Sequence, residues 1–330
     1  MSEYIPPYSI SERMLELVSS ISEKVGRISS RKELESKPTL RRNNRIRSIH
    51  SSLRIEANSL SINEVRDVIN GHLVMGDRKE IQEVKNAYAA YELIRGIDPT
   101  SIDDLKRIHG VMTYLTVEES GIFRTGPEGV FSGDRCIFVC PPPDMVNELM
   151  NNLMGWMKRN EGKVHPLIMA AVFHYEFVFI HPFSDGNGRM ARLWHTVMLY
   201  RWRSIFEYIP LESRIEQFQQ EYYDAIAACH KNGSSDVFIE FMLNMIDQVL
   251  DEVLLQAEKG GSSISRYVKR MLELMEFDVP YTANEIMELL GIRSKETLRK
   301  NYLDPAIELG LIRMTIPDKP KSKNQRYVKQ

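Results

Sequence analysis

Apolar residues recur at helical spacing along most of this chain. The clearest run covers residues 166–180, and a second run covers residues 191–200. The apolar positions of the first run are Ile168, Ala171, Val172, Tyr175 and Phe179. Apolar residues three and four apart lie on one face of a helix. The pattern therefore predicts two buried helices joined by a short loop.

The same period predicts further helices. Their expected ranges are 11–29, 45–58, 61–69, 78–95, 101–115, 144–159, 211–230 and 238–257. A capping box formed by Ser61 and Glu64 marks the start of one of them. Two short strand-like runs, 129–132 and 136–139, flank a Gly-Asp turn signal at 133–134. The chain is therefore predicted to be mainly α, with one β-hairpin.

The loop between the two central helices, HPFSDGNGRMAR at 181–192, concentrates polar chemistry. It contains His181, Asp185, a Gly-Asn-Gly turn, Arg189 and Arg192. A helix N-terminus offers unpaired N–H groups to an anion, and glycine allows a phosphate to approach the backbone closely. A Gly-Asn-Gly turn alone is more often a helix C-cap followed by a new helix. An imidazole, a carboxylate and two guanidiniums together favour a phosphate-binding catalytic site instead.

These residues resemble the signature of Fic-domain proteins, HxFx(D/E)GNGRxxR, and match it at each specified position. Fic enzymes transfer a nucleotide fragment, usually AMP from ATP, to a hydroxyl side chain of a target protein. The resemblance implies the Fic fold, which is a helical bundle with a β-hairpin flap. It also implies that ATP is the substrate and Mg²⁺ the cofactor.

The resemblance assigns the chemical step to two side chains. His181 would take the proton from the attacking Ser, Thr or Tyr hydroxyl, because imidazole titrates near neutral pH. Asp185 would hold Mg²⁺, which binds through one or two carboxylates and bridges phosphate oxygens.

The remaining motif residues would bind the phosphates. The N–H groups of Gly186, Asn187 and Gly188 would cradle the α- and β-phosphates and stabilise charge that develops there. Arg189 would contact the β-phosphate region, and Arg192 would clamp the γ-phosphate.

A second resemblance lies upstream. Ser52 and Glu56 fit the pattern (S/T)xxxE(G/N) of the inhibitory helix of Fic proteins, and their spacing places them on one helical face. In the family this glutamate pairs with the second motif arginine, here Arg192, and denies it to the γ-phosphate. Ala57 replaces the Gly or Asn of the pattern, and because alanine favours helices we expect the helix to persist there. The alternative is that Glu56 is a solvated charge on an amphipathic helix.

The predicted hairpin corresponds to the flap that lies over the nucleotide in Fic proteins. The residues expected to cover the nucleotide are Val130, Phe131, Ser132 and Gly133. A target segment that adds a strand to the flap would place its hydroxyl through backbone hydrogen bonds. Tyr223 is a candidate wall of the adenine pocket, although paired tyrosines on a helix are also typical of core packing.

The composition is that of a large globular chain with room for two domains. It has 330 residues, 43% of them hydrophobic, and 43 Lys/Arg against 45 Asp/Glu give a net charge of −2. We therefore expect no strong attraction to nucleic acid or membrane. Cys136, Cys140 and Cys229 are too few for a disulfide framework, which favours a cytoplasmic location. Because no leader-like segment and no long apolar run is recognisable, we expect neither secretion nor a membrane span.

Residues 262–330 differ from the rest in charge. They carry thirteen Lys/Arg against nine Asp/Glu, a net charge of +4. Two short helices, a strand entry and a basic tip follow one another, in an order that resembles a winged helix. Residues 294–302 would be the recognition-like helix and 317–325 the wing. Winged helices usually bind DNA, but some families use them for protein contacts, and this charge is small for DNA.

We therefore expect an N-terminal helical region at 1–100 with an inhibitory helix at about 45–58, a Fic core at 101–258, and a winged-helix domain at 262–330. The expected activity is protein adenylylation, inhibited by Glu56, with a target protein or the chain itself as the acceptor. Removal of AMP at the same site is one alternative. A DNA-binding regulator with a nucleotide-sensing Fic site is another. The sequence does not decide whether the chain forms a homodimer.

Overall fold

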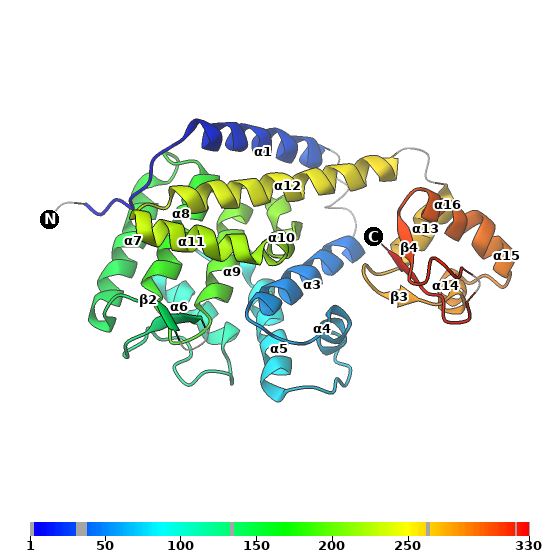
Figure 1. The fold of residues 1–330 in the computed structure, drawn as a ribbon, viewed down its shortest axis with the longest axis horizontal. Helices are drawn as coiled ribbons and strands as arrows, with labels where there is room; N and C mark the ends of the chain where they lie inside the picture. The colour runs from blue at the N-terminus through cyan, green and yellow to red at the C-terminus, as the bar shows by residue number, and fades with distance from the viewer. Residues whose placement is uncertain (1–2, 31–37, 133–134, 262–264, 321, 330) are drawn as a thin grey trace. The chain divides into compact units, whose positions relative to one another are not determined.

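The computed structural model describes residues 3–30, 38–132, 135–261, 265–320 and 322–329, and only the backbone of 38–40, 131–132, 135–137 and 256–261. The chain divides into two compact units (Figure 1). One comprises residues 1–29 and 45–250, and the other comprises 30–44 and 251–330. Gly133, one of the predicted flap residues, lies outside the described residues.

The first unit is a bundle of helices, which confirms the prediction of a mainly helical protein. Its longer helices are α1 (Glu12–Ser30), α3 (Pro38–Ile55) from Arg45 onward, α4 (Ile62–Ile69), α5 (Arg78–Glu92), α6 (Ile102–Met112), α7 (Val146–Asn160), α8 (Pro166–Ile180), α9 (Asn187–Trp202), α10 (Leu211–Gln217), α11 (Gln219–Asn232) and α12 (Asp236–Gly261) as far as Leu250. Short 3₁₀ segments lie at Ile94–Gly96, Pro143–Met145 and Ser204–Tyr208. None of the described helices is both long enough and apolar enough to cross a membrane.

Helices α8 and α9 pack against each other at the centre of this bundle. Twelve of the fifteen residues of α8 are buried, on all sides of the helix. A helix that is apolar all round is stable only when neighbours cover every face. Figure 1 shows α1 lying along α12, where Ser20 donates to Asp247 at 2.7 Å and Lys24 pairs with the same carboxylate at 2.8 Å.

The predicted helix at 211–230 is broken in the structure. Phe218 has φ −113° and ψ 40°, outside the helical region, and separates α10 from α11. The apolar period continues through this position, so the pattern gave no sign of the break. The hairpin is present as β1 (Gly129–Ser132) and β2 (Arg135–Val139), paired antiparallel with an irregularity between Val130 and Phe131.

The second unit contains short helices and a three-stranded sheet. Its elements are α13 (Arg266–Leu274), β3 (Pro280–Tyr281), α14 (Ala283–Leu290), α15 (Lys295–Leu298), a π-helical turn (Arg299–Leu303), α16 (Asp304–Glu308), β4 (Ile312–Met314) and β5 (Tyr327–Lys329). The sheet order is β3-β5-β4. Val268, Ile286 and Leu298 contribute to its hydrophobic core, which brings the helices together.

The expectation that Ala57 would continue helix α3 is wrong. The helix ends at Ile55, and Ala57 adopts a left-handed conformation with φ 63°. The N–H of Asn58 then donates back to the Leu53 carbonyl at 3.1 Å, which closes the helix end. The Gly or Asn of the family pattern suits this conformation, whereas alanine pays a steric cost of about 1 kcal/mol.

We therefore expect Ala57→Gly to stabilise the protein by about 0.5–1 kcal/mol. Ala227→Gly is the matched control, because it makes the same change at another exposed alanine, inside helix α11. There glycine should cost about 1 kcal/mol. Urea unfolding of the two variants checks the opposite signs, and an equal loss of stability in both would show that Ala57 is not strained.

Candidate functional site

The catalytic loop begins where helix α8 ends, at His181. This residue adopts a left-handed conformation with φ 52°, and its N–H caps the helix by donating to the Phe177 carbonyl at 2.9 Å. Its Nδ1 lies 3.2 Å from the Val178 carbonyl, which can only accept. Nδ1 therefore carries the hydrogen, and Nε2 keeps the lone pair that a general base needs.

Burial lowers the pKa of His181 from its ordinary value, because the charged form loses water. Arg124 lowers the pKa further, while the Val178 carbonyl, Glu128 and Glu56 act in the opposite direction. The net direction keeps the imidazole neutral at pH 7. A neutral imidazole can accept a proton, which is the state that a base requires before the chemical step.

The loop returns to helix α9 through Gly186, whose φ of 80° is readily adopted by glycine. The Asn187 side chain fixes this turn from within, because it donates to the Phe183 carbonyl at 2.7 Å and accepts from the Phe183 N–H at 3.0 Å. Asn187 is buried. Its side chain therefore holds the loop, while its main chain begins the helix whose N-terminus faces the predicted phosphate site.

Asp185 precedes that N-terminus and keeps its carboxylate half-exposed. Its Oδ1 accepts from the Gly186 N–H at 2.5 Å and from Arg189 Nη2 at 3.2 Å. Both of these hydrogen bonds are accepted by the same carboxylate oxygen, Oδ1. No described residue donates a hydrogen bond to the other oxygen, which is suited to a cation that also binds phosphate oxygens.

The structure brings Ser52, Glu56 and Arg192 together. Arg192 Nη2 lies 2.7 Å from Glu56 Oε1, and Arg192 also donates to the Ser52 hydroxyl at 3.0 Å and the Ser52 carbonyl at 2.9 Å. The Arg192 side chain is only 1% exposed. Glu56 lies so close to Gly188 that a side chain there would collide with the carboxylate. Glu56 therefore occupies both the guanidinium and the space beside the start of α9.

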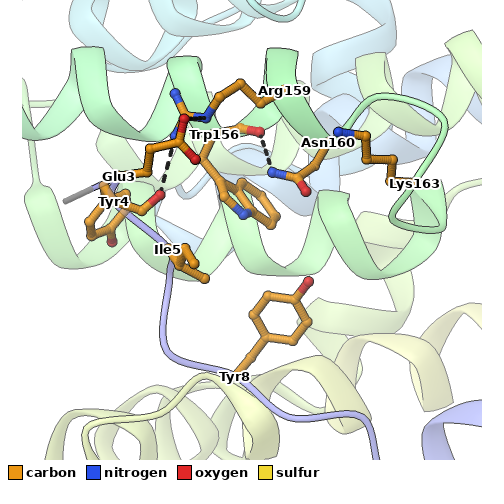
Figure 2. Close-up of a pocket in the computed structure, with 8 residues that line it drawn as sticks. All are labelled: Glu3, Tyr4, Ile5, Tyr8, Trp156, Arg159, Asn160 and Lys163. Atoms are coloured by element: carbon orange, nitrogen blue, oxygen red, sulfur yellow. Dashed lines mark hydrogen bonds and ion pairs between the residues drawn. The ribbon is translucent and has the colours of Figure 1, made fainter.

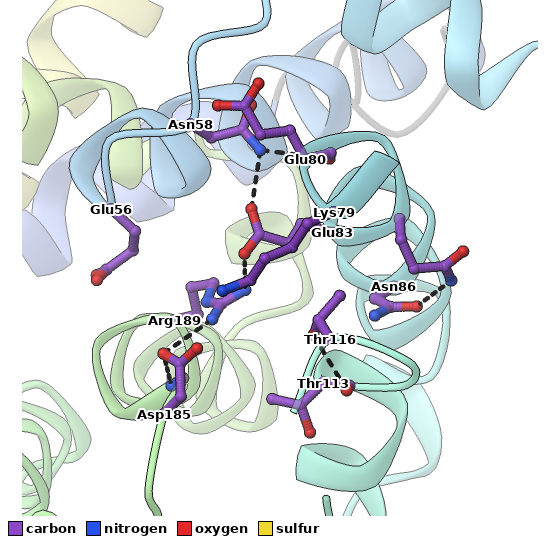
Figure 3. Close-up of polar contacts among 12 residues, drawn as sticks. Glu56, Asn58, Lys79, Glu80, Glu83, Asn86, Thr113, Thr116, Asp185 and Arg189 are labelled. Carbon is purple, nitrogen blue, oxygen red and sulfur yellow. Dashed lines mark hydrogen bonds and ion pairs between the residues drawn. The ribbon is translucent and has the colours of Figure 1, made fainter. Parts of the chain in front are cut away.

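The first motif arginine is held by a carboxylate that the sequence did not suggest. Arg189 Nη1 donates to Glu83 on α5 at 3.3 Å, as Figure 3 shows. The second oxygen of Glu83 accepts from Asn58 Nδ2 at 2.9 Å. Asn58 follows the end of α3, so one carboxylate connects the inhibitory segment with Arg189.

His109 on α6 is a second residue that the sequence analysis missed. Its Nδ1 accepts from the Gly121 N–H, and its Nε2 lies 2.9 Å from the Asp185 carbonyl, to which it donates. The ring stacks on Phe183 at 3.6 Å between centroids. Burial lowers the pKa of His109 to about 4, so the ring stays neutral and holds the Asp185 backbone.

Arg124, on the segment before the hairpin, is the third residue that the sequence analysis missed. It is 3% exposed, and among the residues that the structure describes its guanidinium donates to main-chain oxygens alone. Its acceptors are the carbonyls of His181 at 2.6 Å, Pro141 at 2.6 Å, Gly126 at 2.9 Å and Ile180 at 3.3 Å. No periodic pattern distinguishes such a residue, because most of its partners are backbone atoms of distant segments.

Of the predicted pocket residues outside the motif, Tyr223 and Val130 have described side chains. Tyr223 on α11 is 43% exposed, and its hydroxyl lies 3.4 Å from the Ile55 carbonyl at the end of α3. Its neighbour Tyr222 is buried and contacts His174 Nε2 at 3.0 Å. Val130 is half-buried on β1, and only the backbone of Phe131 and Ser132 is described. Among the described residues, no hydrogen bond joins Val130 or Tyr223 to the motif.

A separate pocket of about 500 Å³ lies beneath the N-terminal segment, against helix α7 (Figure 2). It is lined by Glu3, Tyr4, Ile5, Tyr8, Trp156, Arg159, Asn160 and Lys163. The Tyr4 hydroxyl donates to the buried Glu176 of α8 at 2.6 Å. None of the lining residues belongs to the 181–192 motif, so this pocket is distinct from the candidate site.

Comparison with known proteins identifies both parts of the chain. A sequence profile of the Fic/DOC family matches residues 99–199, and a profile of the "Filamentation induced by cAMP protein Fic-like, C-terminal domain" matches residues 266–328. The chain is 30% identical to the protein adenylyltransferase Fic of Culex quinquefasciatus over 66% of this chain and 46% of that protein. It is 28% identical to that of Drosophila melanogaster over 74% of this chain and 48% of that protein. The chain spans about half the length of these curated relatives.

Solved structures of two other proteins resemble the fold of this chain. A Fic family protein from Desulfovibrio desulfuricans G20 is 38% identical, with a TM-score of 0.74, and the match covers 99% of this chain and 98% of that chain. A Fic domain containing signaling protein from Bacteroides thetaiotaomicron is 20% identical, with a TM-score of 0.59 over 77% of this chain and 100% of that chain. The second likeness concerns the fold alone.

The buried histidine beside the motif predicts how stability depends on pH. The pKa of His109 is about 4 in the folded protein and about 6.5 in an unfolded chain. The unfolded state therefore binds a proton more tightly than the folded state. The contribution of neutral His109 to the free energy of unfolding is complete above pH 6.5 and is lost as pH falls toward 4. His109 alone should account for roughly 3 kcal/mol of this loss.

Urea unfolding of the wild type and of His109→Gln between pH 7.5 and 4.5 measures this contribution. Glutamine can donate to the Asp185 carbonyl but does not titrate, so the variant should lose less stability on acidification than the wild type. Parallel curves for the two proteins would contradict the pKa assigned to His109.

Proposed function

Because this chain belongs to the Fic family, we propose that it is a protein adenylyltransferase that moves AMP from ATP to a Ser, Thr or Tyr hydroxyl of a target protein. The observation that carries the proposal is the Arg192 site, where a guanidinium at the start of α9 is held by a carboxylate instead of a phosphate. His181, with its neutral imidazole, lies at the other end of the same loop. The curated relatives bear the name protein adenylyltransferase, which agrees with this proposal.

In the proposed reaction the target hydroxyl oxygen attacks the α-phosphorus of ATP. A bond forms between that oxygen and the α-phosphorus, and the bond from the α-phosphorus to the bridging oxygen breaks. Pyrophosphate leaves with the electron pair, and the hydroxyl proton passes to Nε2 of His181. The N–H groups of Gly186, Asn187 and Gly188 would stabilise the charge on the phosphates, and Arg189 would contact the β-phosphate region.

The residues present fit a magnesium ion. Asp185 offers one partly exposed carboxylate next to the phosphate site, and one carboxylate with several waters and phosphate oxygens is an ordinary Mg²⁺ environment. When bound, such an ion would neutralise phosphate charge. Arg189 now donates to the same carboxylate and would have to turn toward the phosphates.

The resting protein is proposed to be inhibited by its own N-terminal region. The Glu56 carboxylate and the γ-phosphate compete for Arg192, since each requires the same donor fork. Ser52 would support this state because it accepts from the same guanidinium. ATP would then bind in a form that is unsuited to attack, or would bind weakly.

The target is proposed to pair with the edge of the hairpin. Val130, Phe131 and Ser132 lie on β1, and together with Gly133 they are the residues proposed to cover the nucleotide. Tyr223 would approach the adenine from α11. The cytoplasmic location, a homodimer and modification of the chain by itself stay predictions.

We propose that the chain consists of a helical region (1–100), a Fic core (101–258) and a winged-helix domain (262–330). The order of short helices followed by the β3-β5-β4 sheet supports the winged-helix proposal. A net charge of +4 makes DNA a weaker candidate partner than protein. Gel shifts with random duplex at moderate salt would test DNA binding.

Glu56→Gly should increase the transfer of labelled AMP from ATP to the chain itself, because the substitution frees Arg192. Arg192→Ala in the Glu56→Gly background should be inactive, since the clamp itself is missing. Mass spectrometry for an adduct on Ser, Thr or Tyr is the readout. Equal transfer by the wild type and Glu56→Gly at all ATP concentrations would exclude the inhibitory role, and loss of activity would favour removal of AMP with Glu56 positioning water.

His181→Ala should reduce transfer by about 10²–10⁴-fold, because the base acts only in the chemical step. The dissociation constant for ATP, measured by calorimetry in the Glu56→Gly background, should stay nearly unchanged. Transfer by the variant at the parental rate would show that another group takes the proton.

A further inference from the structure

Arg124 is a buried cation whose partners, within the described part of the chain, are all carbonyl oxygens. Its side chain forms four hydrogen bonds, and no carboxylate of the described residues forms an ion pair with it. An uncompensated charge in a protein interior costs several kcal/mol. Two of the acceptors, Ile180 and His181, lie at the C-terminal end of α8, where the helix dipole supplies partial negative charge. The position therefore suits a cation without a carboxylate partner.

The four carbonyls belong to two structures, which also contact each other through the rings of Phe138 on β2 and Phe179 on α8. Ile180 and His181 form the turn that presents the catalytic imidazole. Gly126 precedes the hairpin and Pro141 follows it, so the guanidinium holds both ends of the flap. The main chain supports the same junction, because the Arg124 N–H donates to the Pro182 carbonyl at 2.9 Å.

We propose that Arg124 is a positioning residue that fixes the flap relative to His181. The inference rests on the proposed function, in which the flap registers the target hydroxyl and His181 receives its proton. If a target strand pairs with the hairpin, the distance from its hydroxyl to His181 Nε2 depends on how the hairpin is joined to the turn. A rigid planar guanidinium with five N–H donors can hold carbonyls from both sides at once.

Substitution of Arg124 by lysine separates an effect of the positive charge from an effect of the guanidinium geometry. Arg124→Lys keeps the positive charge near His181, but a single ammonium has three donors on a flexible stem and cannot span the same carbonyls. Arg124→Gln removes the charge as well. If charge alone mattered, lysine would preserve activity; if the fork holds the junction, both variants should be impaired.

The experiment introduces each variant into the Glu56→Gly chain and measures three quantities. These are the rate of self-modification at saturating labelled ATP, the dissociation constant for ATP, and the hydrogen exchange of the amides in 126–141. Arg201→Lys is the matched control, because Arg201 also donates to a carbonyl, that of Ile97 at 2.6 Å, at the far end of α9.

We expect Arg124→Lys and Arg124→Gln to lower the rate at saturating ATP by roughly 10–100-fold, since a misplacement of about 1 Å can cost a factor of 10². The dissociation constant for ATP should change by less than about threefold, which corresponds to under 1 kcal/mol. Exchange in the hairpin should become faster in both variants and stay unchanged in Arg201→Lys.

Several results would overturn the proposal. They are full activity of Arg124→Lys, loss of ATP affinity in parallel with the rate, unchanged exchange in the hairpin, and unfolding of both variants at the assay temperature. If the Glu56→Gly parent transfers no AMP, the proposed function fails, and hydrogen exchange in the hairpin alone decides whether Arg124 holds the junction.

Discussion

The buried guanidinium of Arg192 is the interaction on which the arrangement of the site depends. It lies near the start of the central helix α9 and donates to the hydroxyl and carbonyl of Ser52 on helix α3 and to the carboxylate of Glu56, which follows the end of that helix. A buried charge that loses its partner is costly, so the helix and the arginine hold each other in place. The same contact fixes Glu56 beside Gly188. Stability and inhibition are therefore two consequences of one ion pair.

Helix α3 is bound to the bundle through buried apolar residues, among them Ile46, Ile49 and Leu53, and also through polar side chains. Ser48 donates to the buried Glu212 at 2.7 Å, and Tyr91 donates to the other oxygen of Glu212 at 2.7 Å. Arg45 bridges Glu92 and Glu207, each at 2.8 Å. Interfaces of this kind are stable only while every polar group keeps its partner. The inhibitory segment is thus held by exchangeable hydrogen bonds and ion pairs in addition to apolar packing.

Buried polar side chains also shape the catalytic loop from outside the motif. His109 holds the Asp185 carbonyl and Arg124 holds the His181 carbonyl, so each of the two chemical residues is fixed through its main chain. Such support orients a reactive side chain without occupying it. The motif supplies reactive groups, and these neighbours supply their geometry.

The sequence by itself determined the helical period, the turn chemistry of the hairpin and the 181–192 loop, because each depends on residues close together in the chain. The Ser52 and Glu56 spacing likewise predicted one helical face. Only the tertiary structure decided the partners of Glu83, His109 and Arg124, because they act on residues or carbonyls from distant segments. It also decided the left-handed end of α3 at Ala57, where tertiary contacts outweigh the helix preference of alanine. Local pattern selects elements, whereas burial and long-range hydrogen bonds select which polar groups meet.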